Sequence, residues 1–421
     1  MRAVLLTYGS RGDVEPFVAL ACGLRQAGHA VLLACPATLR GLAEAHGLAI
    51  LPLPGNPREL VRGLVQDAGL NVPAMVRSVS RYVLPLGASV FQTLLDGIPR
   101  ADLVVHSFLM THAGHEIAQR LGAAQASAQL FPVFAATRCF AAPTFPEAPL
   151  GGAYRRLTHQ LTEAVFRRGS ELLFRRVRRL HPELPRLTGW PFDRRMRPAT
   201  PLLMAYSPSV LTPPSDWPPR VHVTGYWFSP PSPGWSPDPD LCSFLEAGTP
   251  PIYVGIGSSL PAQPALAGRL LEAIGRLELR AVLDRGWGDF WPPNLPTGCR
   301  LVEDIPHAWL LPRVSMAVHH GGAGTSGAVL RAGLPSVVLP FTADQPFWAR
   351  QLARLGAAPP PLSPLRASAD DLTDSMQLAL HDTALRARAA ALGTAVRAED
   401  GVAWAVALLE EHIAASGRAR G

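Results

Sequence analysis

A glycine-rich loop in the last third of the chain has residue types suited to binding phosphates. Residues 318–324 read VHHGGAG, and Thr325 and Ser326 then begin a segment typical of a helix. Glycines let backbone N–H groups approach a ligand closely, and a helix N-terminus adds partial positive charge. With further donors from His319 and Thr325, this loop is suited to a diphosphate. A glycine-rich turn that binds nothing is the alternative.

An acid and an amide follow the next apolar segment. Gly333 ends the helical pattern, residues 336–339 have the pattern of a short buried strand, and Asp344 and Gln345 come shortly after it. A carboxylate beside a carboxamide can accept from and donate to neighbouring sugar hydroxyls. Open α/β sheets bind ligands beyond the carboxyl ends of their strands. The sequence therefore predicts a diphosphate site and a sugar site on adjacent loops.

Alternating strands and helices must position these loops. Apolar segments at 3–7, 30–34 and 49–53 alternate with helical periodicities at 15–27 and 39–46, which indicates βαβ units and a parallel sheet. Helices are also expected between 58 and 98 and, interrupted by prolines, from 151 to 198. Residues 229–239 (SPPSPGWSPDP) are too rich in proline for a helix or central strand and predict a linker. Alternation then resumes, with strands expected at 252–256, 280–284, 316–319 and 336–339.

Composition excludes several classes of protein. The 421 residues predict two to three domains. The net charge of +7 is the excess of arginine over aspartate and glutamate, because the chain has no lysine. The arginines are spread along the chain, unlike the continuous basic stripe of a nucleic-acid binder. Five scattered cysteines without a CxxC pair predict neither disulfides nor a zinc site. Because there is no signal-peptide pattern and no run of about 18 apolar residues, we expect a cytoplasmic protein.

The string HHGGAGT…RAGLP…DQPFW resembles the donor-binding signature of the family 1 GT-B glycosyltransferases, especially the sterol-glucosyltransferase-like and antibiotic branch. Residues 221–227 (VHVTGYW), 252–259 (IYVGIGSS), 305–311 (IPHAWLL) and the GSRGDVEP opening at 9–16 strengthen the resemblance. It implies an α/β GT-B fold with two Rossmann-like domains facing across a cleft. We expect an acceptor-binding domain at 1–215, a strand and linker at 216–250, a donor-binding domain at 251–395, and a C-terminal helix at 396–421 that packs back on the first domain.

The resemblance also implies roles for residues. The loop after residue 318 would contact the donor phosphates, Ile305 the nucleobase through its backbone, His307 the ribose, and Asp344 with Gln345 the sugar hydroxyls. The opening loop would approach the diphosphate from the other domain. The full donor-binding set is Ser10, Arg11, Gly12, Ser258, Ile305, His307, His319, Gly321, Gly322, Ala323, Gly324, Thr325, Asp344 and Gln345.

Asp13 stands where many relatives have the catalytic base, which removes a proton from the acceptor hydroxyl. An N-cap of the following helix is the alternative role for this aspartate. His106 occupies the position where plant relatives have an aspartate, and it either polarises the acceptor or only lines the cleft. Phe131 and Phe134 are expected to line a hydrophobic acceptor pocket, or else to pack in the core.

The implied reaction is an inverting transfer of a hexose from a UDP-glucose-like or dTDP-linked donor to a hydroxyl of a hydrophobic small molecule such as a sterol, carotenoid or polyketide. No metal or other cofactor is expected, because the single DxD match, Asp238-Pro239-Asp240, lies in the linker. Two alternatives are a sugar-nucleotide epimerase of the same fold and a catalytically dead protein that binds a membrane or a partner. An epimerase is disfavoured because it needs acid and base groups around C2 of the donor sugar.

The segment 155–197 is rich in arginine interleaved with leucine, phenylalanine and valine. A basic amphipathic helix of this kind can lie on an anionic membrane surface, which predicts a peripheral contact with the inner membrane. A solvated helix face is the alternative.

Overall fold

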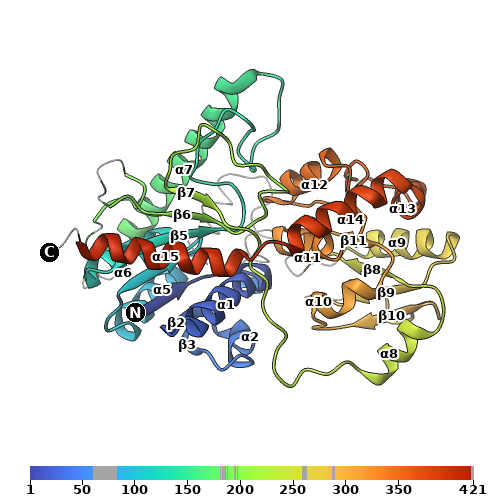
Figure 1. Cartoon of the computed structure of the whole chain (residues 1–421), viewed down its shortest axis with the longest axis horizontal. Coiled ribbons are helices and arrows are strands. Elements are labelled where there is room, and N and C mark those ends of the chain that lie inside the picture. The colour runs from blue at the N-terminus through green and yellow to red at the C-terminus, as the bar shows by residue number, and fades with distance from the viewer. Residues whose placement is uncertain are drawn as a thin grey trace. The chain divides into compact units, whose positions relative to one another are not determined.

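The computed structural model describes residues 1–59, 83–180, 182, 186, 188–193, 196, 198–257, 263–286 and 290–418. The chain forms two compact units (Figure 1). The first contains Met1–Ala205, Pro213–Pro230 and Asp400–Gly421, and the second contains Tyr206–Thr212 and Pro231–Glu399. Both are α/β units, as expected from the sequence.

The first unit is built on a parallel sheet. Seven strands are seen in the described residues, in the order β3-β2-β1-β4-β5-β6-β7. Every neighbouring pair is parallel, with Leu6 of β1 level with His106 of β4. The strands are β1 (Arg2–Leu6), β2 (Ala30–Pro36), β3 (Ala49–Leu53), β4 (Leu103–His106), β5 (Ala124–Gln129), β6 (Leu202–Met204) and β7 (Val221–Val223).

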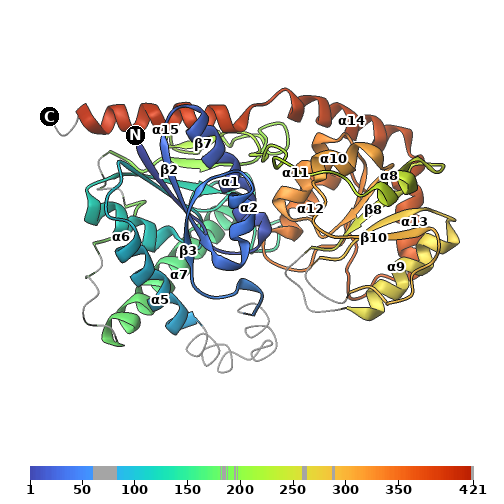
Figure 2. The same cartoon turned by 90° about the horizontal axis from the view of Figure 1, so that it is seen from below.

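Helices cover both faces of this sheet (Figure 2). One face packs on α1 (Arg11–Gln26), α2 (Arg40–Glu44) and α15 (Gly401–Arg418). The other face packs on α5 (Leu84–Gly97), α6 (Thr111–Leu121) and α7 (Gly151–Leu180). The alternation of a β-strand divides β4 between the two cores, with Leu103 and Val105 facing α1 and Val104 facing α6.

The second unit contains a smaller parallel sheet. Five strands are seen where the structure is described, in the order β10-β9-β8-β11-β12. They are β8 (Ile252–Gly255), β9 (Ala281–Asp284), β10 (Cys299–Val302), β11 (Ala317–His319) and β12 (Ser336–Val338). The helices are α8 (Pro239–Glu246), α9 (Pro264–Arg276), α10 (His307–Leu310), α11 (Ala323–Arg331), α12 (Gln345–Arg354), α13 (Ala369–His381) and α14 (Thr383–Arg397).

Two cores hold the second unit together. Ile252 and Val254 of β8 pack with α9 and α13 on one face. Tyr253, between them in sequence, packs with α8, α10 and the Val329 side of α11 on the other. Because β8 and β12 flank β11, the loop after His319 leaves the sheet between two strands that hold it on both sides.

The local predictions differ from the structure in several places. The expected helix at 39–46 is a 3-10 turn (Ala37–Leu39) followed by the short α2. In the segment 151–198, the described residues show one helix, α7, which spans Gly151–Leu180. The helices expected between 58 and 98 lie partly outside the described residues. None of the helices in the described part of the chain is both long and apolar enough to span a bilayer.

Candidate active site

The glycine-rich loop connects the end of β11 to the first turn of α11. Gly321 has φ +85°, which a residue with a side chain adopts only with strain. Gly322 is the N-cap of α11 and offers no side chain to cap the first turn. The first N–H groups of a helix have no partner inside the helix. The N-terminus of α11, with Gly324 and Thr325 in its first turn, is therefore suited to bind an anion.

His319 is fully buried under this loop, and its proton position follows from one hydrogen bond. Its Nδ1 accepts from the Gly321 backbone N–H at 3.1 Å. The proton of the neutral ring is then on Nε2, and Nε2 has no partner among the described residues. Burial, with the neighbouring His320 and His307, lowers the pKa of His319 to about 3. His319 is thus a neutral hydrogen-bond donor near pH 7.

Two further residues of this loop were not predicted from the sequence. The Ser326 hydroxyl in the first turn of α11 is also buried and has no partner in the described structure. The His320 ring lies between two loops, because a Cβ on Gly257 or Gly322 would meet it at 2.8 or 2.5 Å. Ser326 directly follows Thr325 at the predicted helix start, so the sequence could have identified it as a candidate. The packing of His320 depends on the loop after β8, and no signal in the sequence indicates it.

The Asp344-Gln345 loop lies beside the glycine-rich loop. A Cβ on Gly321 would come within 3.2 Å of the Gln345 carbonyl oxygen. The Gln345 side-chain oxygen accepts from the backbone N–H groups of Phe341 and Thr342 at 2.9 and 3.2 Å. Asp344 Oδ2 accepts from the Trp348 indole at 2.9 Å. Gln345 therefore uses its oxygen to shape the loop, and its NH2 group is the part suited to a sugar oxygen.

His307 begins α10 and is held from the sheet side. The Tyr253 hydroxyl donates to Asp284 Oδ2 at 2.9 Å, so it accepts from His307 Nε2 at 3.0 Å. These contacts fix the ring just after Ile305, which is partly buried against the same core. Ser258, predicted to assist the phosphates, lies outside the described residues.

In the first unit, Asp13 is the third residue of α1, and Ser10 is the N-cap. Asp13 Oδ2 accepts from the Ser10 backbone N–H at 2.7 Å and from the Ser10 hydroxyl at 2.9 Å. Asp13 is therefore not the N-cap, although it closes the first turn of the helix from its third position. Oδ1 has no partner among the described residues. Asp13 is partly buried as a residue, and burial raises the pKa of its carboxyl while the Ser10 contacts oppose the rise.

Two neighbours shape this turn. Gly9 has φ +142°, and a Cβ there would lie 2.3 Å from Asp13 Oδ2. Arg11 pairs with Glu15 at 3.2 Å on the first turn of α1, and Gly12 is exposed. The glycine at position 9 thus leaves the space that the Asp13 carboxylate occupies.

His106 lies on the α6 side of the sheet. A Cβ on Gly114 of α6 would be 2.5 Å from the His106 Cβ, and α1 packs on the opposite face. Burial, with His115 and His112 nearby, lowers the pKa of His106 to about 3. Both ring nitrogens are buried and have no partner in the described residues. The structure groups His106 with the α6 histidines rather than with Asp13.

Phe131 and Phe134 belong to an aromatic cluster beyond the ends of β4 and β5. Phe134 is buried with φ +59°, and its ring centroid lies 5.5 Å from those of Phe108 and Trp190. Phe131 is only partly buried and contacts Phe108 at 5.3 Å. The other members of the cluster are Phe166 of α7 and Phe192. Phe134 is the packed centre, and Phe131 and Phe108 keep exposed surface.

No group of three His, Cys, Asp or Glu side chains in the described residues is arranged to hold a metal ion. The DxD match begins α8, where Asp238 is the N-cap. Arg300 pairs with both Asp238 and Asp240 at 3.5 Å. These aspartates therefore have a structural role at the start of α8.

Comparison with known families matches both parts of the chain. Residues 269–407 match the C-terminal domain of the erythromycin biosynthesis protein CIII-like family. Residues 3–84 match the glycosyltransferase family 28 N-terminal domain.

Among curated proteins, the chain is 38% identical to O-mycaminosyltylonolide 6-deoxyallosyltransferase of Streptomyces fradiae, over 98% of this chain and 97% of that protein. It is 32% identical to the sterol 3-beta-glucosyltransferase of Neosartorya fischeri, over 96% of this chain but 29% of that protein. The chain thus spans under a third of the length of that sterol enzyme.

Solved structures share the fold over nearly the whole chain. The calicheamicin glycosyltransferase CalG4 superposes with a TM-score of 0.70 at 17% identity, covering 98% of each chain. The glycosyltransferase VinC, solved in complex with dTDP, superposes with a TM-score of 0.66 at 19% identity, covering 100% of each chain. Together with the sequence relatives, these matches show that the chain is a glycosyltransferase of the GT-B fold and belongs to the family that contains the antibiotic and sterol glycosyltransferases.

Proposed function

We propose that this enzyme transfers a hexose from a UDP- or dTDP-linked donor to a hydroxyl of a hydrophobic small molecule, with inversion at the anomeric carbon. One observation carries the donor side of this proposal. His319 Nε2 and the Ser326 hydroxyl are buried without partners in the described structure, at the open N-terminus of α11. Buried polar groups normally have hydrogen-bond partners, and a diphosphate supplies acceptor oxygens at this position.

The donor is held by neutral groups in this proposal. The N–H groups of Gly324 and Thr325, together with His319, donate hydrogen bonds that stabilise the negative charge developing on the diphosphate as it leaves. Asp344 and the Gln345 NH2 group bind the hexose hydroxyls from the adjacent loop. Ile305 and His307 lie toward the nucleoside. The structural relative VinC was solved in complex with dTDP, which supports dTDP beside UDP as the nucleotide.

Asp13 is the proposed base. Its Oδ1 takes the proton of the acceptor hydroxyl while that oxygen attacks the anomeric carbon, and the bond from this carbon to the diphosphate oxygen breaks. An α-linked donor then yields a β-glycoside. An aspartate of ordinary pKa is a weak base, and the burial that raises the pKa of Asp13 makes its carboxylate a stronger one.

The acceptor is proposed to contact Phe108 and Phe131 at the exposed part of the aromatic cluster. Ring faces suit an apolar acceptor body and leave its hydroxyl free to react. The relatives named for a tylonolide and for sterols support an acceptor of this kind. We further propose that catalysis needs no resident metal, and that the enzyme works in the cytoplasm with a peripheral contact to the inner membrane.

A screen of UDP- and dTDP-sugars against pooled sterols, carotenoid alcohols and polyketides, read by mass spectrometry, tests the proposal. A product heavier than its acceptor by one anhydrohexose, formed equally in EDTA, is expected. The Asp13→Ala variant should keep nucleotide affinity and lose product. An epimerised donor in the absence of acceptor would favour the epimerase alternative. Nucleotide binding with no product from any pair would favour a catalytically dead protein.

A further inference from the structure

Most of the large apolar side chains that the described structure exposes lie on α7 or beside it. On the helix, Leu157, Leu161, Val165 and Leu172 are 50%, 44%, 72% and 66% exposed. Leu150, just before the helix, is 66% exposed. The second unit has only Leu365 and Leu378 of this kind in its described part. An apolar stripe of this length on one element marks an interaction surface.

The stripe is one face of a long helix. Its four members recur at intervals of four and seven residues, which keeps them on the same side of an α-helix. The same side continues with Arg168, Arg175, Arg176 and Arg179, all exposed. At about 1.5 Å per residue, the 30 residues of α7 extend for about 45 Å. We call these eight residues the α7 outer face.

The α7 outer face has basic but no acidic side chains. The two glutamates of the helix, Glu163 and Glu171, are only partly exposed and bind Trp190 and Arg167. None of the four outer-face arginines pairs with a carboxylate in the described part of the chain. Near the C-terminal end of α7, Arg175, Arg178, Arg179 and Arg186 help to line a hollow of about 680 Å³, and Glu171 is the only carboxylate among its described lining residues. This end of α7 is suited to an anionic partner.

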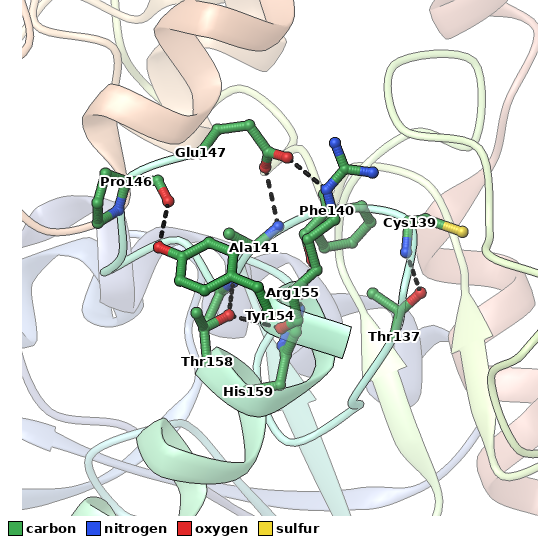
Figure 3. Close-up of polar contacts among 11 residues, drawn as sticks. Thr137, Cys139, Phe140, Ala141, Pro146, Glu147, Tyr154, Arg155, Thr158 and His159 are labelled. Carbon is green, nitrogen blue, oxygen red and sulfur yellow. Dashed lines mark hydrogen bonds and ion pairs between the residues drawn. The ribbon is translucent and has the colours of Figure 1, made fainter. Parts of the chain in front are cut away.

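Polar contacts hold the start of α7 firmly to the preceding loop (Figure 3). The Tyr154 hydroxyl donates to the Pro146 carbonyl at 2.9 Å, and Arg155 pairs with Glu147 at 2.6 Å. One turn later, His159 bonds to the Phe140 carbonyl at 3.1 Å. Further along, Phe174 and Val177 pack in the sheet core. The apolar stripe is therefore exposed on an anchored helix.

We propose that the α7 outer face binds the surface of a membrane containing anionic lipids. Aliphatic side chains can enter the acyl boundary while arginines contact lipid phosphates, which is the chemistry of an interfacial helix. A second copy of this chain fits less well, because its outer face would bring arginines against arginines with no carboxylates between them. The inference rests on the membrane contact of the proposed function and identifies the surface that makes it.

The location of α7 gives this binding a use in catalysis. Phe166, on the inner side of the helix, contacts Phe108 at 4.4 Å and Phe134 at 5.3 Å. Phe108 is one of the rings proposed to contact the acceptor. A helix lying on the bilayer would bring this aromatic cluster close to the lipid surface, where a hydrophobic acceptor is concentrated.

Co-sedimentation with vesicles tests the proposal on the full-length protein. Vesicles of equal parts phosphatidylglycerol and phosphatidylcholine are compared with phosphatidylcholine alone. The protein should sediment with the anionic vesicles, and salt should weaken binding. Replacing Leu161, Val165 and Leu172 with serine should reduce the partition coefficient at least about tenfold. Replacing Arg168, Arg175 and Arg179 with glutamine should reduce it about fivefold for each arginine.

Matched controls come from the second unit. Leu365→Ser with Leu378→Ser, and Arg354, Arg366 and Arg386 replaced with glutamine, should bind vesicles like the wild type. Unchanged UDP or dTDP affinity and melting temperature show that the α7 variants fold. Asp13→Ala should still bind vesicles, so failure of sugar transfer and failure of membrane binding are separate results. Equal binding to both vesicle types, unchanged binding by the α7 variants, or a wild-type dimer that the leucine changes dissociate would overturn the proposal.

Discussion

The two ring nitrogens of His319 can be tested separately, because each has a different partner. Nδ1 accepts from Gly321, and Nε2 carries the proton without a partner in the described structure. In His319→Asn, the amide oxygen can still accept from Gly321, but no donor reaches the Nε2 position. In His319→Gln, the longer amide places a donor near Nε2 and loses the acceptor near Gly321. Only the asparagine variant removes the hydrogen bond proposed for the phosphate.

A hydrogen bond to a charged group contributes about 1.5–3 kcal/mol, whereas a bond between neutral groups contributes about 0.5–1.5 kcal/mol. His319→Asn should therefore weaken UDP and dTDP binding by about 10- to 150-fold. His319→Gln should weaken it less, because it loses only the bond that supports the loop. Isothermal titration calorimetry at pH 7.5 measures both affinities.

A matched control is His115→Asn, which alters another buried histidine that bonds a side chain through Nδ1. Its nucleotide affinity should equal that of the wild type. Wild-type affinity in His319→Asn would refute the donor role of Nε2. An equal loss in the asparagine and glutamine variants would show that the ring acts through the Gly321 loop instead.

Three further predictions concern the first unit and acid stability. Gly9→Ala should lower kcat at least about tenfold with unchanged nucleotide affinity, because its Cβ displaces the Asp13 carboxylate; wild-type kcat would contradict this. Ser10→Ala removes a hydrogen bond that lowers the Asp13 pKa, so the acid limb of the kcat/KM profile should move to higher pH, not lower. His106 and His319 have pKa values of about 3 when folded against about 6.5 unfolded. The unfolded chain therefore binds more protons between these pH values. As the pH is lowered below 6.5, urea titrations should show that the free energy of unfolding decreases by up to about 1.4 kcal/mol per pH unit for each histidine. The His106→Phe variant should show a smaller decrease.

Strands rich in aliphatic residues were predictable from the sequence, and others were not. Residues 3–7 (AVLLT) and 252–256 (IYVGI) are mostly apolar, and β1 and β8 form there. β5 reads AQASAQ, which carries no apolar run, yet it lies between β4 and β6 in the sheet. Its alanines are small enough for the packed helices, and Gln125 bonds His115 and Thr200. Such a strand is specified by its neighbours rather than by its own composition.

The candidate site divides in the same way. The loop from Gly321 to Thr325 depends on local turn chemistry, so its position between β11 and α11 follows from the order of residues. The proton position of His319 depends on the folded path of its own loop, which brings the Gly321 backbone N–H to Nδ1, and the packing of His320 depends on the loop after β8. The sequence left two roles open for His106, and only the alternation of β4 shows that its ring packs on α6. The sequence identifies which residues are available, and packing decides which way each ring points.

In the complex proposed above, the neutral state of His319 means that this loop would bind the diphosphate without a full positive charge. No side chain from Ala317 to Leu330 is Asp, Glu or Arg. Burial lowers the pKa of His319 to about 3, far below pH 7. The ring therefore stays neutral and acts with the α11 dipole through oriented N–H groups. Fixed dipoles need no rearrangement as charge moves onto the leaving diphosphate. Burial of His319 therefore favours a hydrogen-bond donor that is already oriented before the bond to the sugar breaks.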